Sequence, residues 1–342
     1  MKVLELLKTS QKTAFSFEIL PPLKGNSFQK VCNIIDKLKE FDPKYINITT
    51  HHSETFYQET SDGGFKKMNI RKRPGTVAIA AAIQHQYGIT AVPHIICKGF
   101  SKEETEYALI DLNFLGVHEL LLLRGDTKNL ALNAYPPGAS HEHTTGLIEQ
   151  VNHFNQGISI DGTPFEKMET PFSYGVACYP EKHEEAPNLK SDLAFLKQKI
   201  EMGAEYAVTQ MFFDNRKYFN FVELCRAEGI TVPIIPGIKP IVFQDQLTVL
   251  PQIFRTDIPE ALASEIRKCK NNDEVKQVGV EWSIEQCKEL IQHGVPSLHF
   301  YTLMATDSVR RIAEAIYDLT PSPSPQGEGS RISSCGDDAN NK

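Results

Sequence analysis

Short apolar runs alternate with longer amphipathic stretches along most of the 342-residue chain, and this alternation constrains the fold more than any other feature. Most of the runs are almost continuously apolar, as expected of parallel strands that are buried on both faces. They cover residues 15–20, 45–50, 91–96, 119–124, 174–179, 206–213, 232–238 and 298–304. The stretches that follow them have the period of helices and cover residues 27–40, 76–87, 102–115, 143–155, 189–202, 215–228, 243–254 and 283–293.

Eight strand–helix units are the number found in a (β/α)8 TIM barrel, which folds as a single α/β domain. An open doubly wound sheet could also hold eight strands, but it would normally bind a nucleotide through a G-x-G-x-x-G turn, which this sequence lacks. We therefore expect one barrel over residues 1–319, ending in a helix from Asp307 to Leu319. Residues 320–342 are rich in Pro, Ser and Gly, and Ile332 is their only large aliphatic residue, so we expect a disordered tail.

Charge and cysteine usage narrow the class of protein further. A net charge of −7 argues against a nucleic-acid or anionic-membrane surface. The seven cysteines are scattered and never spaced C-x-x-C, which is typical of a reducing compartment. The N-terminal stretch has no signal-peptide pattern, and no segment is apolar for long enough to span a bilayer. We expect a soluble, cytoplasmic protein.

Glu18 lies inside the first apolar run, FSFEILPP, where the neighbouring side chains favour burial. A carboxylate in such a strand either has a partner or has a raised pKa, and a raised pKa would allow it to hold and donate a proton near neutral pH. A strand Glu can also point to solvent or pair with a nearby Lys. The residue is therefore a candidate general acid with a structural alternative.

Polar side chains follow nearly every predicted strand, at the end where barrels carry their chemistry. A group at one or two strand ends would be unremarkable, but this number predicts a large polar ligand site. The residues are Glu18, Thr49, Thr50, His51, His52, His94, Arg124, Gly125, Asp126, Tyr179, Pro180, Glu181, Gln210, Lys239, Tyr301 and Thr302.

The run LLLLRGD delivers Arg124, Gly125 and Asp126 in succession to the end of the fourth strand. An Arg side chain can form a fork onto phosphate or carbonyl oxygens, Gly lets a ligand approach the backbone, and Asp can accept from ring N–H groups. The alternative is an ordinary Arg–Asp turn pair.

The segment YPEKHEEA follows the fifth strand and leads into a helix. Tyr179 offers a stacking face and His183 a donor, although the segment could also be a solvated loop. On the helix, Asp192, Phe195 and Lys199 form a second stripe beside the apolar core stripe. A surface stripe seldom includes Phe, so a ligand could cover this face.

Two other polar features have competing explanations. Gln210 in TQMFFD needs hydrogen bonds that either a flat heterocyclic amide or barrel neighbours could supply. The pair His51–His52 and the triplet at 141–143 invite a metal interpretation, but no third ligand stands at a suitable spacing, so we expect no metal site. His94 could be a core histidine, although its place at a strand end favours a ligand contact.

Taken together, the motifs FSFEILPP, PHIICKG, LLLLRGD, YPEKHEEA, TQMFFD, IIPGIKP and HFYTL have the order and spacing of methylenetetrahydrofolate reductases, and the chain resembles the bacterial catalytic domain of that family over residues 10–319. The resemblance implies a flavin-binding catalytic barrel that holds FAD non-covalently, usually in a homo-oligomer. It also implies a ping-pong reaction: NADH or NADPH reduces the flavin and leaves, and 5,10-methylenetetrahydrofolate is then reduced to 5-methyltetrahydrofolate.

The same resemblance assigns roles to individual residues. Glu18 would be the general acid that helps to open the methylene bridge, and Asp126 would lie near both flavin and pterin. Gln210 and Gln246 would contact the folate. The flavin contacts would be Thr49, Thr50, His52, His94, Arg124, Gly125, Asp126, Thr144, Tyr179, His183, Ala186, Asp192, Gln198 and Lys199.

The sequence departs from the family pattern in several places. Ala305 stands where the family has an Arg that contacts folate, Phe195 stands where it typically has Asn at the flavin, and the connection from Thr127 to Ser173 is long. Two other functions remain open at this stage: a non-catalytic flavin- or pterin-binding barrel, and a flavin-independent barrel lyase.

Overall fold

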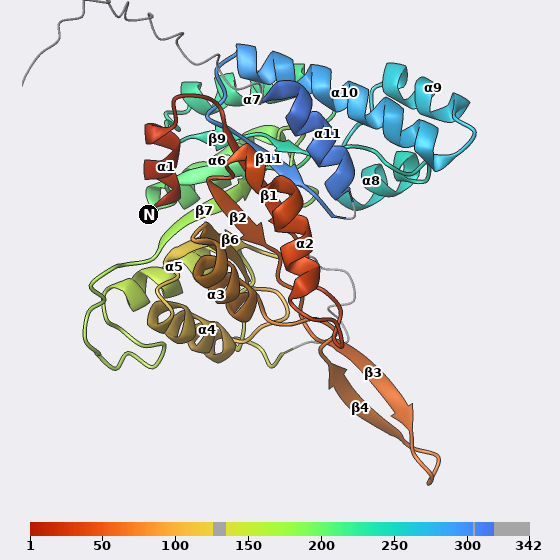
Figure 1. Cartoon of the computed structure of the whole chain (residues 1–342). Helices are drawn as coiled ribbons and strands as arrows, with labels where there is room; N and C mark the ends of the chain where they lie inside the picture. The colour runs from red at the N-terminus through yellow and green to blue at the C-terminus, as the bar shows by residue number, and fades with distance from the viewer. Residues whose placement is uncertain (126–134, 304, 318–342) are drawn as a thin grey trace, which may run out of the picture.

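The computed structural model describes residues 1–125, 135–303 and 305–317, which fold around one parallel β-barrel (Figure 1). The strands are hydrogen-bonded in the order β10-β11-β1-β2-β5-β6-β7-β8-β9. They are β1 (Ala14–Ile19), β2 (Tyr45–Ile48), β5 (Thr90–Ile96), β6 (Glu119–Leu123), β7 (Ser173–Cys178), β8 (Tyr206–Thr209), β9 (Ile234–Ile235), β10 (Gly237–Ile238) and β11 (Ser297–Tyr301).

The segment 234–238 closes the barrel. Its first half, β9, pairs with β8, and its second half, β10, pairs with β11. Pro236 separates the two halves because proline has no backbone N–H group for a ladder. The predicted strand 232–238 is therefore present as two short strands that together fill one position of the barrel. The predicted (β/α)8 TIM barrel is confirmed.

Helices surround the barrel, and most of them agree with the amphipathic stretches of the sequence. Two of their starting points are set by caps: Ser101 and Glu104 form a capping box before α4, and Asn188 accepts a hydrogen bond from the Ser191 amide before α6. The helices are α1 (Val3–Thr9), α2 (Gln29–Leu38), α3 (Thr76–Tyr87), α4 (Lys102–Phe114), α5 (Thr144–Asn155), α6 (Leu189–Glu201), α7 (Asn215–Ala227), α8 (Gln246–Phe254), α9 (Glu260–Lys268), α10 (Asn272–Gln292) and α11 (Thr306–Ile316), with a 3-10 turn η1 (Lys39–Phe41).

Strand alternation separates the main core from the barrel interior. On β1, Phe15, Phe17 and Ile19 join the large apolar cluster between barrel and helices. Ser16 and Glu18 lie on the opposite face, and Ser16 Oγ is 3.0 Å from His299 Nδ1 of the neighbouring strand β11. The barrel interior thus holds polar groups beside a smaller apolar cluster that includes Val92, Leu121 and Val208. This arrangement places Glu18 near the carboxyl end of the strands.

The structure contains elements that the sequence pattern did not predict. A two-stranded antiparallel hairpin, β3 (Glu54–Glu59) and β4 (Phe65–Ile70), projects from the barrel after β2 (Figure 1). The helices α1 and α9 were missed, and α10 is much longer than the predicted helix 283–293. The predicted strand 206–213 was too long, since β8 ends at Thr209.

The final helix α11 ends at Ile316, three residues before the predicted end at Leu319. The predicted tail, residues 320–342, lies outside the described residues. Within the part of the chain that the structure describes, no helix is long and apolar enough to cross a membrane.

Candidate functional site

Glu18 lies near the carboxyl end of β1 and is only 7% exposed. Its Oε2 atom is 3.6 Å from His94 Nε2 and 4.0 Å from His299 Nε2. Neither histidine Nε2 atom has a hydrogen-bond partner among the described residues. The carboxylate therefore faces two ring nitrogens that still have capacity to bind a ligand or a proton.

The charge state of Glu18 differs from the raised-pKa expectation. Burial alone would raise the pKa of Glu18, but His299, His94 and Lys239 outweigh it, and the pKa lies below its ordinary value. Burial lowers the pKa of His94 to about 4, so this ring is neutral at neutral pH. Of the two alternatives that the sequence left for Glu18, a partner or a raised pKa, the structure has the first.

Arg124 and Gly125 follow β6 at the same end of the barrel. Both terminal nitrogens of Arg124 donate to Glu185, with a distance of 2.6 Å between Nη2 and Oε1. Its Nε atom is buried and has no hydrogen-bond partner within the described residues. Gly125 has a φ of +85°, and a Cβ atom there would lie 3.2 Å from Ile96, so glycine is favoured at this position. Asp126 lies outside the described residues, and the partner found for Arg124 is Glu185.

The segment 179–186 forms the rim of the barrel mouth beside Arg124. The rings of Tyr179 and His183 pack edge to face, with their centroids 4.6 Å apart. The His183 amide donates to Asp192 Oδ2 at 2.8 Å, which ties the rim to α6. Burial lowers the pKa of His183. Ala186 is buried in the same segment.

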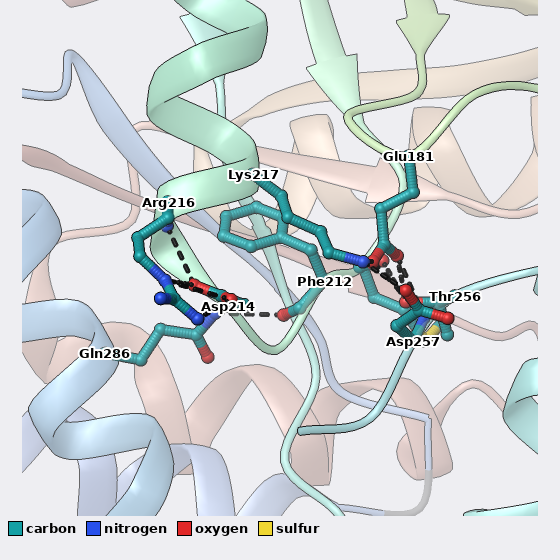
Figure 2. A network of polar contacts seen from close by, with 9 residues as sticks. Glu181, Phe212, Asp214, Arg216, Lys217, Thr256, Asp257 and Gln286 are labelled. Carbon is teal, nitrogen blue, oxygen red and sulfur yellow. Dashed lines mark hydrogen bonds and ion pairs between the residues drawn. The ribbon is translucent and has the colours of Figure 1, made fainter. Parts of the chain in front are cut away.

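A polar network connects the rim to α7 and to the segment after α8 (Figure 2). Glu181 accepts hydrogen bonds from Thr256 Oγ1 at 2.7 Å and from the Asp257 amide at 3.1 Å. Lys217 of α7 donates to both Glu181 and Asp257. We refer to these four residues, Glu181, Lys217, Thr256 and Asp257, as the rim network. Sequence reasoning placed Glu181 at a strand end but could not find its partners, which come from two distant segments.

Other predicted contacts cluster around the same mouth. Thr50 Oγ1 donates to the His94 carbonyl, and the buried Thr49 Oγ1 has no hydrogen-bond partner among the described residues. Gln210 lines a small pocket with Tyr179 and Met211. Lys199 Nζ donates to the Ala177 carbonyl of β7 at 2.8 Å.

Two further predicted residues have mainly local contacts. His52 Nδ1 is 2.9 Å from the Ser53 carbonyl, and the His52 ring packs against Gly99. Gln246 Oε1 accepts from the Val242 amide at 2.7 Å at the start of α8. This contact leaves the amide N–H groups of Gln246 to donate to a ligand.

Thr144 and Gln198 are not joined to the site by a described contact. Thr144 begins α5, and Gln198 lies exposed on α6. Within the described residues, no hydrogen bond connects either side chain to Glu18 or Arg124. Their flavin contacts stay predictions.

The histidines considered for a metal have other surroundings. His141 Nε2 is 2.7 Å from Gln150 Oε1, and burial lowers the pKa of His141. In the described part of the chain, no group of three His, Cys, Asp or Glu side chains is arranged to hold a metal ion.

The fold and the mouth define the class of this protein: a TIM barrel with polar side chains gathered at the carboxyl end of its strands. The methylenetetrahydrofolate reductase family model matches residues 2–317, and the chain belongs to this family.

Individual relatives support this membership. The chain is 30% identical over 315 residues to a protein of Caenorhabditis elegans named probable methylenetetrahydrofolate reductase (NADPH). It is 29% identical over 294 residues to the 5,10-methylenetetrahydrofolate reductase of Salmonella typhimurium. The matches cover 92% and 84% of this chain. The chain spans 43% of the nematode protein and 85% of the bacterial one.

Solved structures with low sequence identity share the fold. A protein from Clostridium thermocellum, described as binding two copies of 5-methyl-5,6,7,8-tetrahydrofolic acid, matches 92% of this chain and 97% of its own length, with a TM-score of 0.55 and 13% identity. An F420-dependent secondary alcohol dehydrogenase matches 91% of this chain and its full length, with a TM-score of 0.51 and 12% identity. These similarities show the barrel fold alone.

Proposed function

We propose that this protein reduces 5,10-methylenetetrahydrofolate to 5-methyltetrahydrofolate with NADH or NADPH, using non-covalent FAD in a ping-pong reaction. The observation that carries the proposal is Glu18, a buried carboxylate at the mouth of a barrel from the methylenetetrahydrofolate reductase family. Relatives are named for both reductants, NADPH in C. elegans and NADH in Arabidopsis thaliana, so we leave the nucleotide open.

The residues at the mouth fit a flavin dinucleotide. Arg124 Nε and Thr49 Oγ1 are buried without hydrogen-bond partners among the described residues, and Gly125 permits close approach to the backbone. Arg124 can present a fork to phosphate oxygens when Glu185 moves aside. When bound, FAD supplies the hydride carrier between the nicotinamide and the folate.

Glu18 is proposed to hold a proton and deliver it to folate nitrogen N10 as the methylene bridge opens. The lowered pKa means that the carboxylate is ionised in the free protein at neutral pH. A bound pterin would exclude water from the mouth, and this added desolvation would raise the pKa of Glu18 and favour proton uptake. The proton is thus taken up with the substrate.

Two glutamines are proposed to position the folate. Gln210 is part of the pocket at the mouth, and the amide N–H groups of Gln246 at the start of α8 can donate to the substrate. Asp126, which lies outside the described residues, is proposed to act near flavin and pterin. Ala305 is buried and offers no charge to the folate, so any such contact must come from elsewhere, for instance Lys239.

The assembly and location are part of the same proposal. We infer a cytoplasmic protein that works on small molecules and binds neither nucleic acid nor membranes, because the net charge is −7 and the cysteines are scattered. The homo-oligomer belongs to the proposal because the family resemblance implies it.

A direct test is to identify any flavin released from the purified protein and to measure NADH and NADPH oxidation with and without methylenetetrahydrofolate. The proposal predicts bound FAD and nucleotide oxidation that depends on the folate. Bound flavin without turnover would instead indicate a binding barrel. Turnover without flavin would contradict the proposed cofactor.

A further inference from the structure

One aromatic residue of α6 is exposed on a face that is otherwise connected to the barrel mouth. Leu193 and Leu196 of this helix are buried in the core. Phe195 belongs to a different stripe, and 55% of its surface is exposed to solvent. Packing in the core therefore does not account for an aromatic residue at this position.

The two neighbours of Phe195 on its helical face are both held at the mouth. Asp192, three residues before it, accepts from the His183 amide at 2.8 Å. Lys199, four residues after it, donates to the Ala177 carbonyl of β7 at 2.8 Å. Residues three and four apart are neighbours on a helix surface, so Phe195 lies between these two tethers.

A series of hydrogen bonds leads from the phosphate-binding candidate Arg124 to Asp192, one helical turn before Phe195. Arg124 donates to Glu185, the Glu185 amide donates to His183 Nδ1 at 3.2 Å, and the His183 amide donates to Asp192. Phe195 is one helical turn beyond Asp192. An elongated ligand that extends outward from Arg124 along the rim would reach the Phe195 ring at its far end.

We propose that Phe195 is the surface on which the adenine ring of FAD stacks, and that it makes the protein prefer FAD over the mononucleotide FMN. This inference rests on the proposed flavin function. Every purine base has a π-face that an exposed aromatic ring can cover, and FMN lacks the adenosine part of FAD. Stacking at Phe195 therefore contributes to the affinity for FAD but not to that for FMN.

The test compares flavin affinities of the full-length protein after its flavin has been removed. The variants are Phe195→Ala, Phe195→Trp and the control Phe114→Ala, which removes an 89% exposed ring at the end of α4. Titration with FAD and with FMN, followed by flavin fluorescence, gives the dissociation constants. We expect Phe195→Ala to weaken FAD binding about tenfold and to leave FMN binding unchanged. Phe195→Trp should restore FAD affinity, and Phe114→Ala should have no effect.

Several results would overturn the inference. Equal FAD affinity of Phe195→Ala and the original protein would show that the ring contacts no part of the flavin. Equal weakening of FAD and FMN would assign Phe195 a structural role. An effect on the KM for NADH or NADPH alone would place the ring at the reductant. Absence of flavin binding in the original protein would overturn the proposed function as well, whereas the first three results leave that function intact.

Discussion

The chemistry of single residues in this protein depends on what surrounds Glu18. His94 and His299 approach the same carboxylate oxygen, and Lys239 follows β10 at the same end of the barrel. Replacing Glu18 by Gln keeps the shape of the side chain and removes its exchangeable acidic proton. This variant separates proton transfer to the folate from every step that needs no acid.

We predict that Glu18→Gln leaves FAD binding and NAD(P)H oxidation by an artificial electron acceptor nearly unchanged. Folate reduction should fall by at least ~10²-fold, the usual contribution of a general acid. Separate assays of the two half-reactions measure this difference. Unchanged folate turnover would exclude Glu18 as the acid.

Lys239 provides a test through pH. Its positive charge helps to lower the pKa of Glu18, so Lys239→Met should raise that pKa. Glu18 would then keep its proton to a higher pH, and the alkaline limb of the folate-reduction profile should move upward by about one unit. The pH profile of the folate half-reaction measures the limb. A limb that stays in place or moves downward would contradict the assigned charge coupling.

At the scale of elements, α1 is held at the opposite end of the barrel by an acidic residue. Glu119 at the start of β6 accepts from the Val3 amide at 3.1 Å, and burial raises the pKa of Glu119 to about 7. The unfolded chain releases this proton at lower pH than the folded protein does. The contribution of Glu119 to stability therefore decreases as the pH rises from about 4.5 to about 7.

We predict that Glu119→Gln removes this pH dependence, because the amide oxygen can still accept from Val3 without a charge. The difference in the free energy of unfolding between the variant and the original protein should be more favourable to the variant at pH 8 than at pH 5, by on the order of 2 kcal/mol. Denaturant unfolding at both pH values measures the gain. A variant that is equally or more destabilised at the higher pH would contradict the assignment.

The rim network makes a second prediction at this scale. Glu181→Ala leaves Lys217 without one partner and frees the segment 254–257 from the rim (Figure 2). We expect a loss of about 1–3 kcal/mol of stability and faster amide exchange in residues 179–186. Hydrogen exchange with mass spectrometry measures the local effect.

Arg216→Ala is the matched control for this variant. Arg216 lies next to Lys217 on α7, its side chain is 84% exposed, and it pairs with Asp214, the N-cap residue of this helix. It should change stability by less than about 0.5 kcal/mol. Equal exchange in the two variants would show that the rim does not depend on Glu181.

The strands of the barrel were predicted well because buried parallel strands are continuously apolar. Most helices were predicted from their amphipathic period, since one face of each packs on the barrel. The helix at 76–87 was predicted with its observed bounds. The β3–β4 hairpin was missed because its strands carry exposed, mixed residues without a clear apolar alternation, and α1 is too short to show a period. The first half of α10 was missed because its start is marked by the Asn271 cap and not by apolar periodicity.

The candidate site was predictable to a similar degree. Barrel topology brings strand ends together, so the grouping of Glu18, His94 and Arg124 at one mouth followed from their positions in the runs. The pKa of Glu18 did not follow, because it depends on His299 and Lys239, which arrive from strands more than two hundred residues away in the sequence. Partners of this kind are set by three-dimensional packing.

In the whole molecule, one barrel mouth gathers the residues on which the proposed reaction depends. The mouth combines a buried carboxylate, a guanidinium fork, a glycine that admits a ligand to the backbone and a rim tied to α6. Such a site can serve two substrates in turn only if each half-reaction proceeds in the absence of the other substrate. The ping-pong proposal therefore has a direct consequence for the isolated protein.

The most direct measurement is an anaerobic single-turnover experiment on the flavin-loaded protein, followed by its visible absorbance. The ping-pong proposal predicts that NADH or NADPH alone bleaches the flavin band. 5,10-Methylenetetrahydrofolate alone should then restore the band, with one 5-methyltetrahydrofolate formed per flavin. Bleaching that requires the folate to be present, or a reduced flavin that the folate does not reoxidise, would contradict the central claim.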